Sequence, residues 1–145
     1  MKKTILSLAC IFLTGIIFGQ TLSKGNILGV HVLNEFELQP GVTMEQFEEF
    51  WLYNDSWEDF NNRFEDIKMY PLKGIRGEHG DILGFLWYLD SDDVRNKYWA
   101  QEGVFSESEA GQAITEFFPG WQQELLKYIN LTGDQFTLYT DWEIQ

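Results

Sequence analysis

The pattern of apolar and polar positions is most informative about the architecture in residues 73–99. Residues 82–90 are apolar in both alternating sets of positions, which predicts a strand covered on both faces. A shorter strand at 70–77 and a glycine-rich turn at 77–81 precede it, as in a β-hairpin. Ser91 then caps a helix whose first turn carries two acids. The stretch therefore predicts a β-hairpin that leads into an amphipathic helix.

Two further elements precede the hairpin. Residues 27–38 alternate, which predicts a strand whose apolar set forms its buried face. That set is Leu28, Val30, Val32, Phe36 and Leu38. Thr43 and Gln46 form a capping box at the start of a long amphipathic helix, residues 44–66, with a candidate kink at 54–56.

Three boundaries are predicted after the hairpin. The helix capped by a serine should end at Gly103. A second helix starts at 106–109 and runs to 128, and Pro119-Gly120 should kink or divide it. Residues 136–142 alternate again and predict the last strand.

The predicted order of elements is β-α-β-β-α-β, within one domain that spans residues 20–145. Right-handed crossovers place both helices on one face of a four-stranded antiparallel sheet, which is the ferredoxin-like split βαβ topology. The fold class is therefore α+β. The central strand is apolar on its other face too, so that face needs a partner, and we expect a homodimer.

The N-terminus has the pattern of a secretory signal peptide. Lys2 and Lys3 precede an apolar run at 5–18, which is shorter than a membrane-spanning helix and ends at Gly19. We expect cleavage after Gly19, a leader of residues 1–19 and an exported protein, periplasmic or extracellular. A lipoprotein anchored at Cys10 is the alternative, which we disfavour because most of the apolar run would then remain.

The chain is strongly acidic, with a net charge of −13, and removal of the two leader lysines makes it −15. Such a surface repels nucleic acid and anionic lipid, so neither is expected as a partner. Cleavage also removes the only cysteine. With two histidines, no thiol and no metal-ligand spacing, we expect no metal site.

Four segments taken in order resemble the dimeric α/β-barrel superfamily. They are LQPGVTMEQFEEFW, LKGIRGEHGDILGFLWYL, DSDDVRNKYW and YTDW. The resemblance implies that two ferredoxin-like sheets pair into a barrel, with a cavity between sheet and helices in each subunit. Members include aromatic-polyketide monooxygenases, haem-degrading enzymes, chlorite-dismutase-like proteins and muconolactone isomerases. Asn34 matches the asparagine of the haem-degrading pattern, but no histidine follows His79, so we expect no haem and no other cofactor.

We take six residues as candidates for lining a pocket. They are His31, Asn34, Trp51, Arg76, Trp87 and Trp99. His31 is either a general base in a cavity or a hydrogen-bonded residue at a subunit interface. Arg76 either clamps a ligand carboxylate or pairs with one of the many acids. The tryptophans fit a core as well as a pocket, and His79 is expected to have no role.

Three functions fit these residues. We favour binding of a small apolar or aromatic ligand between the sheet and the helices. The alternative is a cofactor-independent oxygenase or isomerase acting on an aromatic or quinone-like substrate, with His31 or Asn34 handling protons and Arg76 orienting the substrate. The third is a purely structural partner domain. An enzyme needs a titratable group with a shifted pKa inside its cavity, whereas a binder needs only apolar walls.

Overall fold

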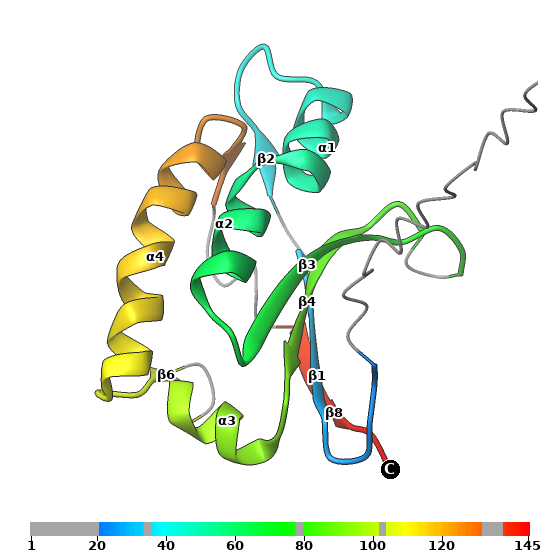
Figure 1. The fold of residues 1–145 in the computed structure, drawn as a ribbon. Coiled ribbons are helices and arrows are strands. Elements are labelled where there is room, and N and C mark those ends of the chain that lie inside the picture. Colours follow the sequence, from blue (N-terminus) through cyan, green and yellow to red (C-terminus); the bar gives the residue numbers. More distant parts are fainter. Residues whose placement is uncertain (1–20, 34–35, 78–79, 102–103, 132–137) are drawn as a thin grey trace, which may run out of the picture.

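The computed structural model describes residues 21–145 apart from 34–35, 78–79, 102–103 and 132–137 (Figure 1). The helices are α1 (Met44–Tyr53), α2 (Ser56–Arg63), α3 (Asp92–Tyr98) and α4 (Glu109–Leu125). The strands are β1 (Ile27–Val32), β2 (Glu37–Leu38), β3 (Ile67–Lys73), β4 (Leu83–Leu89), β5 (Trp99–Gln101), β6 (Val104–Phe105), β7 (Ile129–Asn130) and β8 (Leu138–Glu143). The expected leader lies outside the described residues and stays a prediction.

One antiparallel sheet contains β1, β3, β4 and β8, in the order β3-β4-β1-β8. Because β1 lies between β4 and β8, Gly29 is opposite Trp87 on one side and Asp141 on the other. β2 pairs with β7, and β5 pairs with β6, in short two-stranded ladders. The predicted α+β class with a four-stranded antiparallel sheet is confirmed.

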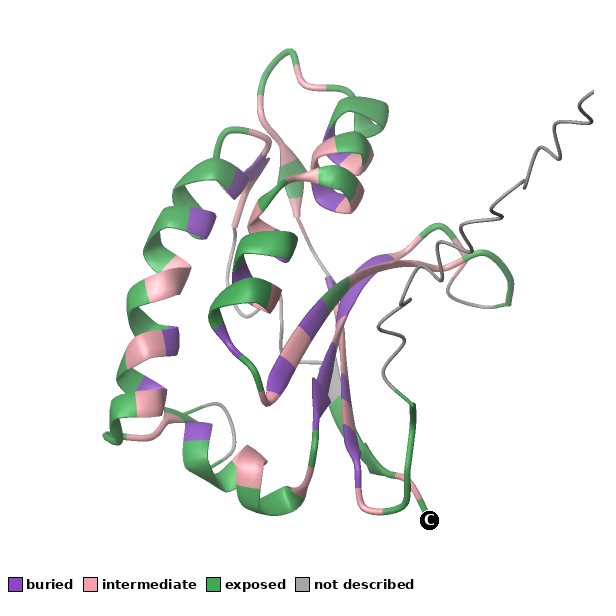
Figure 2. Ribbon diagram, in the orientation of Figure 1, coloured by how far each residue is buried: buried purple, intermediate pink, exposed green. Residues whose placement is uncertain are grey.

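The helices form a layer on one side of this sheet. Figure 1 shows α1, α2 and α4 on that side, with α3 near one end of the strands. α1 and α2 pack on β3, and α3 packs on β4 and α4. The buried core lies between the two layers, where burial of aromatic and aliphatic surface stabilises the fold (Figure 2). Its most enclosed side chains include Phe47, Trp51, Phe60, Ile67, Met69, Ile114 and Leu125.

The first strand faces the helices with the opposite set of residues from the one its pattern predicts. His31 lies opposite Phe85 in the ladder, and paired residues point to the same face. Phe85 packs against helix residue Trp51, so His31 and Gly29 face the helices too. The apolar set that begins with Leu28 therefore points away from them. The physical reason is that Phe85 and Trp87 of β4 point into the core, and paired residues of β1 must point the same way. Gly29, which has no side chain, lies opposite the bulky Trp87.

The expected helix at 44–66 is two helices. The predicted capping box is confirmed, because the Gln46 amide donates to Thr43 Oγ1 at 3.2 Å and the Thr43 amide donates to Gln46 Oε1 at 2.9 Å. α1 then ends at Asn54, whose side chain donates to the Phe50 carbonyl at 2.8 Å. Its Oδ1 accepts the Ser56 amide at 3.0 Å. This one asparagine side chain satisfies groups on both sides of the break.

Other predicted boundaries also move. The helix capped by Ser91 ends at Tyr98, before Gly103, because the chain then enters β5, which pairs with β6. The last helix begins after Ser108, whose Oγ accepts the Gly111 amide at 3.1 Å. α4 continues through Pro119, so the expected division there does not occur. The first predicted strand is also shorter, since β1 ends before residue 33 and β2 pairs elsewhere.

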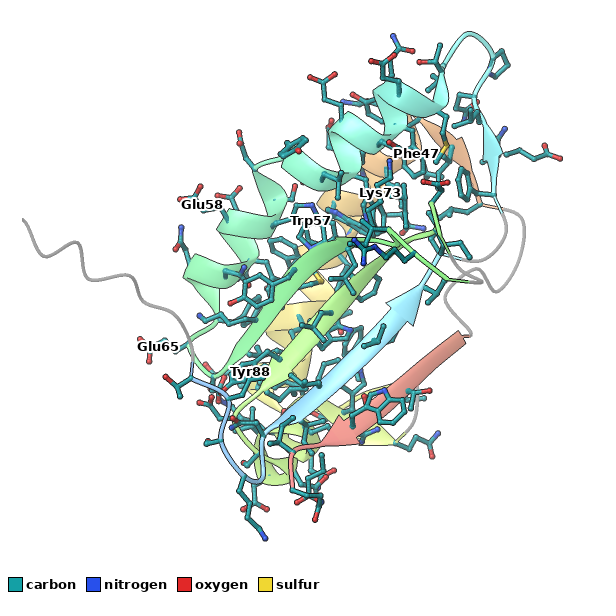
Figure 3. All side chains as sticks on the ribbon, turned by 90° about the vertical axis from the view of Figure 1, so that its right-hand side faces the viewer. Phe47, Trp57, Glu58, Glu65, Lys73 and Tyr88 are labelled. Carbon is teal, nitrogen blue, oxygen red and sulfur yellow. The ribbon has the colours of Figure 1, made fainter. Side chains whose placement is uncertain are left out.

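The second face of the sheet points away from the helices, and Figure 3 views the molecule from that side. Side chains alternate along β4, so Leu86 and Tyr88 lie on this outer face while their neighbours face the helices. The outer face contains Leu28, Val30, Val32, Tyr70, Leu72, Leu86, Tyr88 and Trp142, and the same register also places Lys68 and Thr140 there. Tyr70 and Trp142 are 39% and 60% exposed. Both faces of β4 are thus apolar, but among the described residues a helix layer covers only one of them.

A pair of glycine substitutions tests the close approach of β1 and β4. A Cβ at Gly84 would lie 2.4 Å from the His31 carbonyl oxygen, whereas a Cβ at Gly120 in α4 meets no heavy atom within 4 Å. Gly84→Ala should lower the free energy of unfolding by about 1–3 kcal/mol, since the backbone must shift. Gly120→Ala, the control, should leave it unchanged or raise it by up to about 1 kcal/mol, because alanine favours a helix. Urea denaturation measures both, and equal stability of the two variants would contradict the packing.

Candidate functional site

Trp51 lies at the centre of the core. Its side chain is 0% exposed, and its Nε1 donates to the Gly84 carbonyl at 2.9 Å. Its ring meets the rings of Trp57 and Trp121 edge to face, with centroids 5.4 and 5.9 Å apart. Such edge-to-face pairs add to the stability that burial provides. Trp51 therefore connects α1, α2 and α4 to the middle of the sheet, enclosed by other side chains.

Trp87 and Trp99 are neighbours closer to the surface of the core. Trp87 is 4% exposed and meets the Trp99 ring edge to face, with centroids 5.2 Å apart. Trp99 is half-buried and also packs on Phe105. On its other side Trp87 contacts His31, with centroids 6.3 Å apart. These contacts form an aromatic wall that leads from the core towards β1.

His31 is half-buried against this wall. Its imidazole stacks on the Phe85 ring with centroids 4.7 Å apart and planes inclined by 10°. Burial lowers the pKa of His31 to about 4, and the Asp141 carboxylate opposes this shift without cancelling it. The imidazole is therefore neutral at neutral pH, when it can both donate and accept a hydrogen bond.

Asp141 reaches the same region from β8. The Arg95 Nε lies 3.4 Å from its Oδ2, and the two side chains are 21% and 35% exposed. Gly29 makes room for the carboxylate, since a Cβ there would lie 2.6 Å from Asp141 Oδ1. The same Cβ would lie 3.4 Å from the Cβ of Trp87, so the carboxylate lies beside the aromatic wall. We call His31, Trp87, Arg95, Trp99 and Asp141 the His31 cluster.

The helix side of the sheet becomes more open from β3 to β8. On β3, Ile67 and Met69 are 0% and 1% exposed, and on β4 Leu83 is 2% exposed. On β8 the Asp141 side chain is 35% exposed. α1 and α2 pack on β3, at the opposite edge of the sheet. The His31 cluster therefore lies where the closed core gives way to solvent.

The structure brings together four of the six candidates from the sequence. Trp51, Trp87, Trp99 and His31 belong to one continuous set of aromatic contacts. Arg76 is exposed in the turn that joins β3 to β4, and Asn34 lies outside the described residues.

Sequence reasoning missed Asp141 as a site residue and left Arg95 out of the candidate set. Only the sheet register places Asp141 opposite Gly29 and beside His31. The one signal in the sequence is a carboxylate in a strand otherwise rich in aromatic and β-branched residues.

A separate groove of about 490 Å³ lies where the end of α2, α3 and the start of α4 meet. It is lined by Arg63, Phe64, Lys97, Tyr98, Ser108, Glu109, Ala110 and Ala113. None of the six candidates lines it.

In the part of the chain that the structure describes, no cluster of three or more histidine, cysteine, aspartate or glutamate residues could hold a metal ion. Nor do the described helices include one that is long and apolar enough to span a membrane.

No family model matches this chain, and no match to it was found among curated proteins or among solved structures.

The pH dependence of stability tests the environment of His31. Its pKa is about 4 in the folded state and 6.5 without burial, so between these values the unfolded chain binds a proton that the folded chain does not. The free energy of unfolding should therefore fall, on the order of 3 kcal/mol from this group, as the pH drops through that range. His31→Gln should remove this part of the pH dependence in urea denaturation. His79→Gln, in the glycine-rich turn, should retain it, and identical curves for the wild type and His31→Gln would refute the assignment.

Proposed function

We propose that the domain binds a small apolar or aromatic molecule at the His31 cluster, between the helix side of the sheet and the helices. The observation that carries the proposal is a neutral histidine, held against an aromatic wall, next to a partly exposed arginine–carboxylate pair. Small-molecule sites combine apolar walls with a few polar groups that orient the ligand. Trp87 and Trp99 would provide the wall, and Asp141 with Arg95 would provide the polar groups.

The position of the cluster supports this function. Over β3 and β4 the space between the layers is filled by enclosed side chains, so a ligand could enter there only by displacing the core. At the β8 edge the polar side chains are partly exposed. A planar ligand could pack on the half-buried Trp99 ring beside Trp87 and place a polar group at Asp141.

A catalytic role for the same residues is the second candidate. It is favoured by a titratable group with a shifted pKa in the cluster, which is typical of active sites. A cofactor-independent oxygenase or isomerase would use His31 to move a proton on an aromatic or quinone-like substrate. However, a base with a pKa near 4 is weak at neutral pH, where general bases work best with a pKa close to the operating pH. Binding therefore fits the environment of His31 better than catalysis.

We also propose that the domain is ferredoxin-like and forms a dimer through its outer sheet face. The strand order β3-β4-β1-β8 supports this topology, with α1 and α2 connecting β1 to β3 and α3 and α4 between β4 and β8. The outer face supports the dimer, because it is largely apolar in a chain with 23 acids and 10 bases. A second copy offers the same largely apolar surface, on which the register places one base, Lys68, whereas the remaining acidic surface would repel it.

Export remains part of this proposal. The basic start and apolar run of residues 1–19 support removal of a leader and delivery to the periplasm or beyond. A ligand that reaches the domain there would be one present outside the cytoplasm.

Ligand binding is tested by calorimetry with 2-naphthol, a neutral planar probe. Binding is expected for the wild type, and Trp99→Leu should weaken it about tenfold, or about 1.4 kcal/mol, because one side of the aromatic wall is lost. Tyr53→Leu is the control, since Tyr53 is 77% exposed on α1. Native mass spectrometry of the exported protein adds two readouts, the absence of residues 1–19 and a reproducible extra mass from a retained ligand. Absence of binding to neutral aromatic probes, together with a spectrum free of extra mass, would refute the binding function.

Dimer formation is tested by sedimentation at micromolar protein. The double variant Tyr70→Glu/Trp142→Glu should raise the dimer Kd by at least about tenfold, since it places acids on the apolar outer face. Both side chains are already exposed in the single chain, so the fold should persist. Leu126→Glu, at the end of α4 and 39% exposed, is the matched control and should leave the dimer intact. A wild-type monomer at micromolar concentration would overturn the proposed dimer.

A further inference from the structure

The groove between α2, α3 and α4 shares no lining residue with the His31 cluster, although its Tyr98 ring lies next to the Trp99 ring, with centroids 6.0 Å apart. Its volume of about 490 Å³ falls within the range of small-molecule pockets. Its apolar walls are Phe64, Tyr98, Ala110 and Ala113. The two rings meet edge to face, with centroids 6.1 Å apart. A planar ligand of moderate size would find rings on one wall and small side chains on the other.

Two cations flank these rings. The Arg63 guanidinium carbon lies 5.6 Å from the centroid of the Phe64 ring, and Lys97 Nζ lies 5.0 Å from that of Tyr98. Both distances are within reach of a cation–π interaction, which holds each charge over its ring. The chain has only 10 bases against 23 acids, yet two of them line one groove beside a single acid, Glu109. The lining thus holds more bases than acids, and both cations pair with acids outside the lining, Asp66 and Glu116.

The present partners of the cations leave room for a ligand anion. Lys97 Nζ binds Asp66 Oδ2 at 2.7 Å, and the Tyr98 hydroxyl donates to the same carboxylate, so Lys97 is held in place. Burial alone would raise the pKa of Asp66, but the hydrogen bonds from Lys97 and Tyr98, the charge of Lys97 and a backbone hydrogen bond together lower it. The ion pair of Arg63 with Glu116 is a surface contact of 3.7 Å, and the Glu116 side chain is 75% exposed. Exposed pairs of this kind contribute between 0 and about 1 kcal/mol, so Arg63 can exchange Glu116 for a better-placed anion.

We propose that this groove binds small aromatic carboxylates. The ligand carboxylate pairs with Arg63, whose planar guanidinium fits a carboxylate in a two-bond geometry, with Lys97 adding a second positive charge. The ligand ring packs between Phe64 and the alanines of α4. The site is distinct from the one at His31, and the charge complementarity of Arg63 and Lys97 is what selects an anion over a neutral ring.

The test is an NMR titration of the full-length domain with 2-naphthoate, followed through the amide and methyl signals of Ala110 and Ala113. Saturable shifts at these two alanines are expected, and neutral 2-naphthamide should bind at least tenfold more weakly. Arg63→Gln should weaken 2-naphthoate by at least tenfold without unfolding the protein, because the Arg63 side chain is 46% exposed. Lys127→Gln is the matched control, since Lys127 is 63% exposed and pairs with Glu124.

The same titration distinguishes binding in the groove from binding at the His31 cluster. Saturable shifts of Ala110 and Ala113 whose affinity His31→Gln leaves unchanged and Arg63→Gln lowers at least tenfold support the groove, whatever the fate of the His31 cluster. Equal affinity for 2-naphthoate and 2-naphthamide would overturn the proposal, as would shifts confined to residues around Trp87. Retention of full affinity in Arg63→Gln would overturn it as well.

Discussion

The packing of Trp51 against the start of β4, at Gly84 and Phe85, is the constraint on which the rest of the structure depends. Trp51 is fully enclosed, and its ring nitrogen is satisfied by the Gly84 carbonyl at 2.9 Å. An indole N–H buried without an acceptor would cost about 1–3 kcal/mol, so this bond fixes where α1 lies along β4. Once that position is set, Phe85 and Trp87 point to the helices and Leu86 and Tyr88 point away. Because β1 pairs with β4, its residues take matching orientations, so His31 points to the helices and Leu28 points away from them.

The environment of His31 follows from its position on the helix side of the sheet. On the outer face the imidazole would be one polar group on an apolar sheet. On the helix side it stacks on Phe85, and burial keeps it neutral at ordinary pH. The charged groups of this region are Arg95 and Asp141, which face each other and remain partly exposed. Charge thus stays at the edge of the site, where water can reach it, and the neutral ring lies deeper, as desolvation requires.

Two regions of the surface depart from the acidic character of the chain, and they do so in different ways. The outer sheet face is largely without charge, so it can approach a like-charged copy more easily than other surfaces can. The groove beside Phe64 carries Arg63 and Lys97, each held above a ring. Asp66 connects this groove to the start of β3, because its carboxylate accepts from both Lys97 and Tyr98. One carboxylate therefore orders a cation and a ring at the junction of three helices.

The local pattern of the sequence determined the class of fold and most of its elements. The continuous apolar run at 82–90 is enough to predict β4, and the Thr43–Gln46 capping box predicts the start of α1, because both signals involve residues close in the chain. The candidate kink at 54–56 anticipated the break at Asn54. The short ladders of β2 and β5 were not predicted, since each depends on a strand partner supplied by the folded chain.

The candidate site likewise has a part that the sequence predicts and a part that it does not. The aromatic residues and His31 could be chosen from the sequence because residue type and local spacing single them out. Which face of β1 is buried could not, since a strand with apolar residues on one parity can turn either face to a core, and the partner strand decides. Asp141 lies more than a hundred positions from His31, and only the β1–β8 register brings them to one side of the sheet. The sequence by itself thus determined the elements and their chemistry. Tertiary structure alone decided which side chains share a face, because that depends on pairing between distant strands.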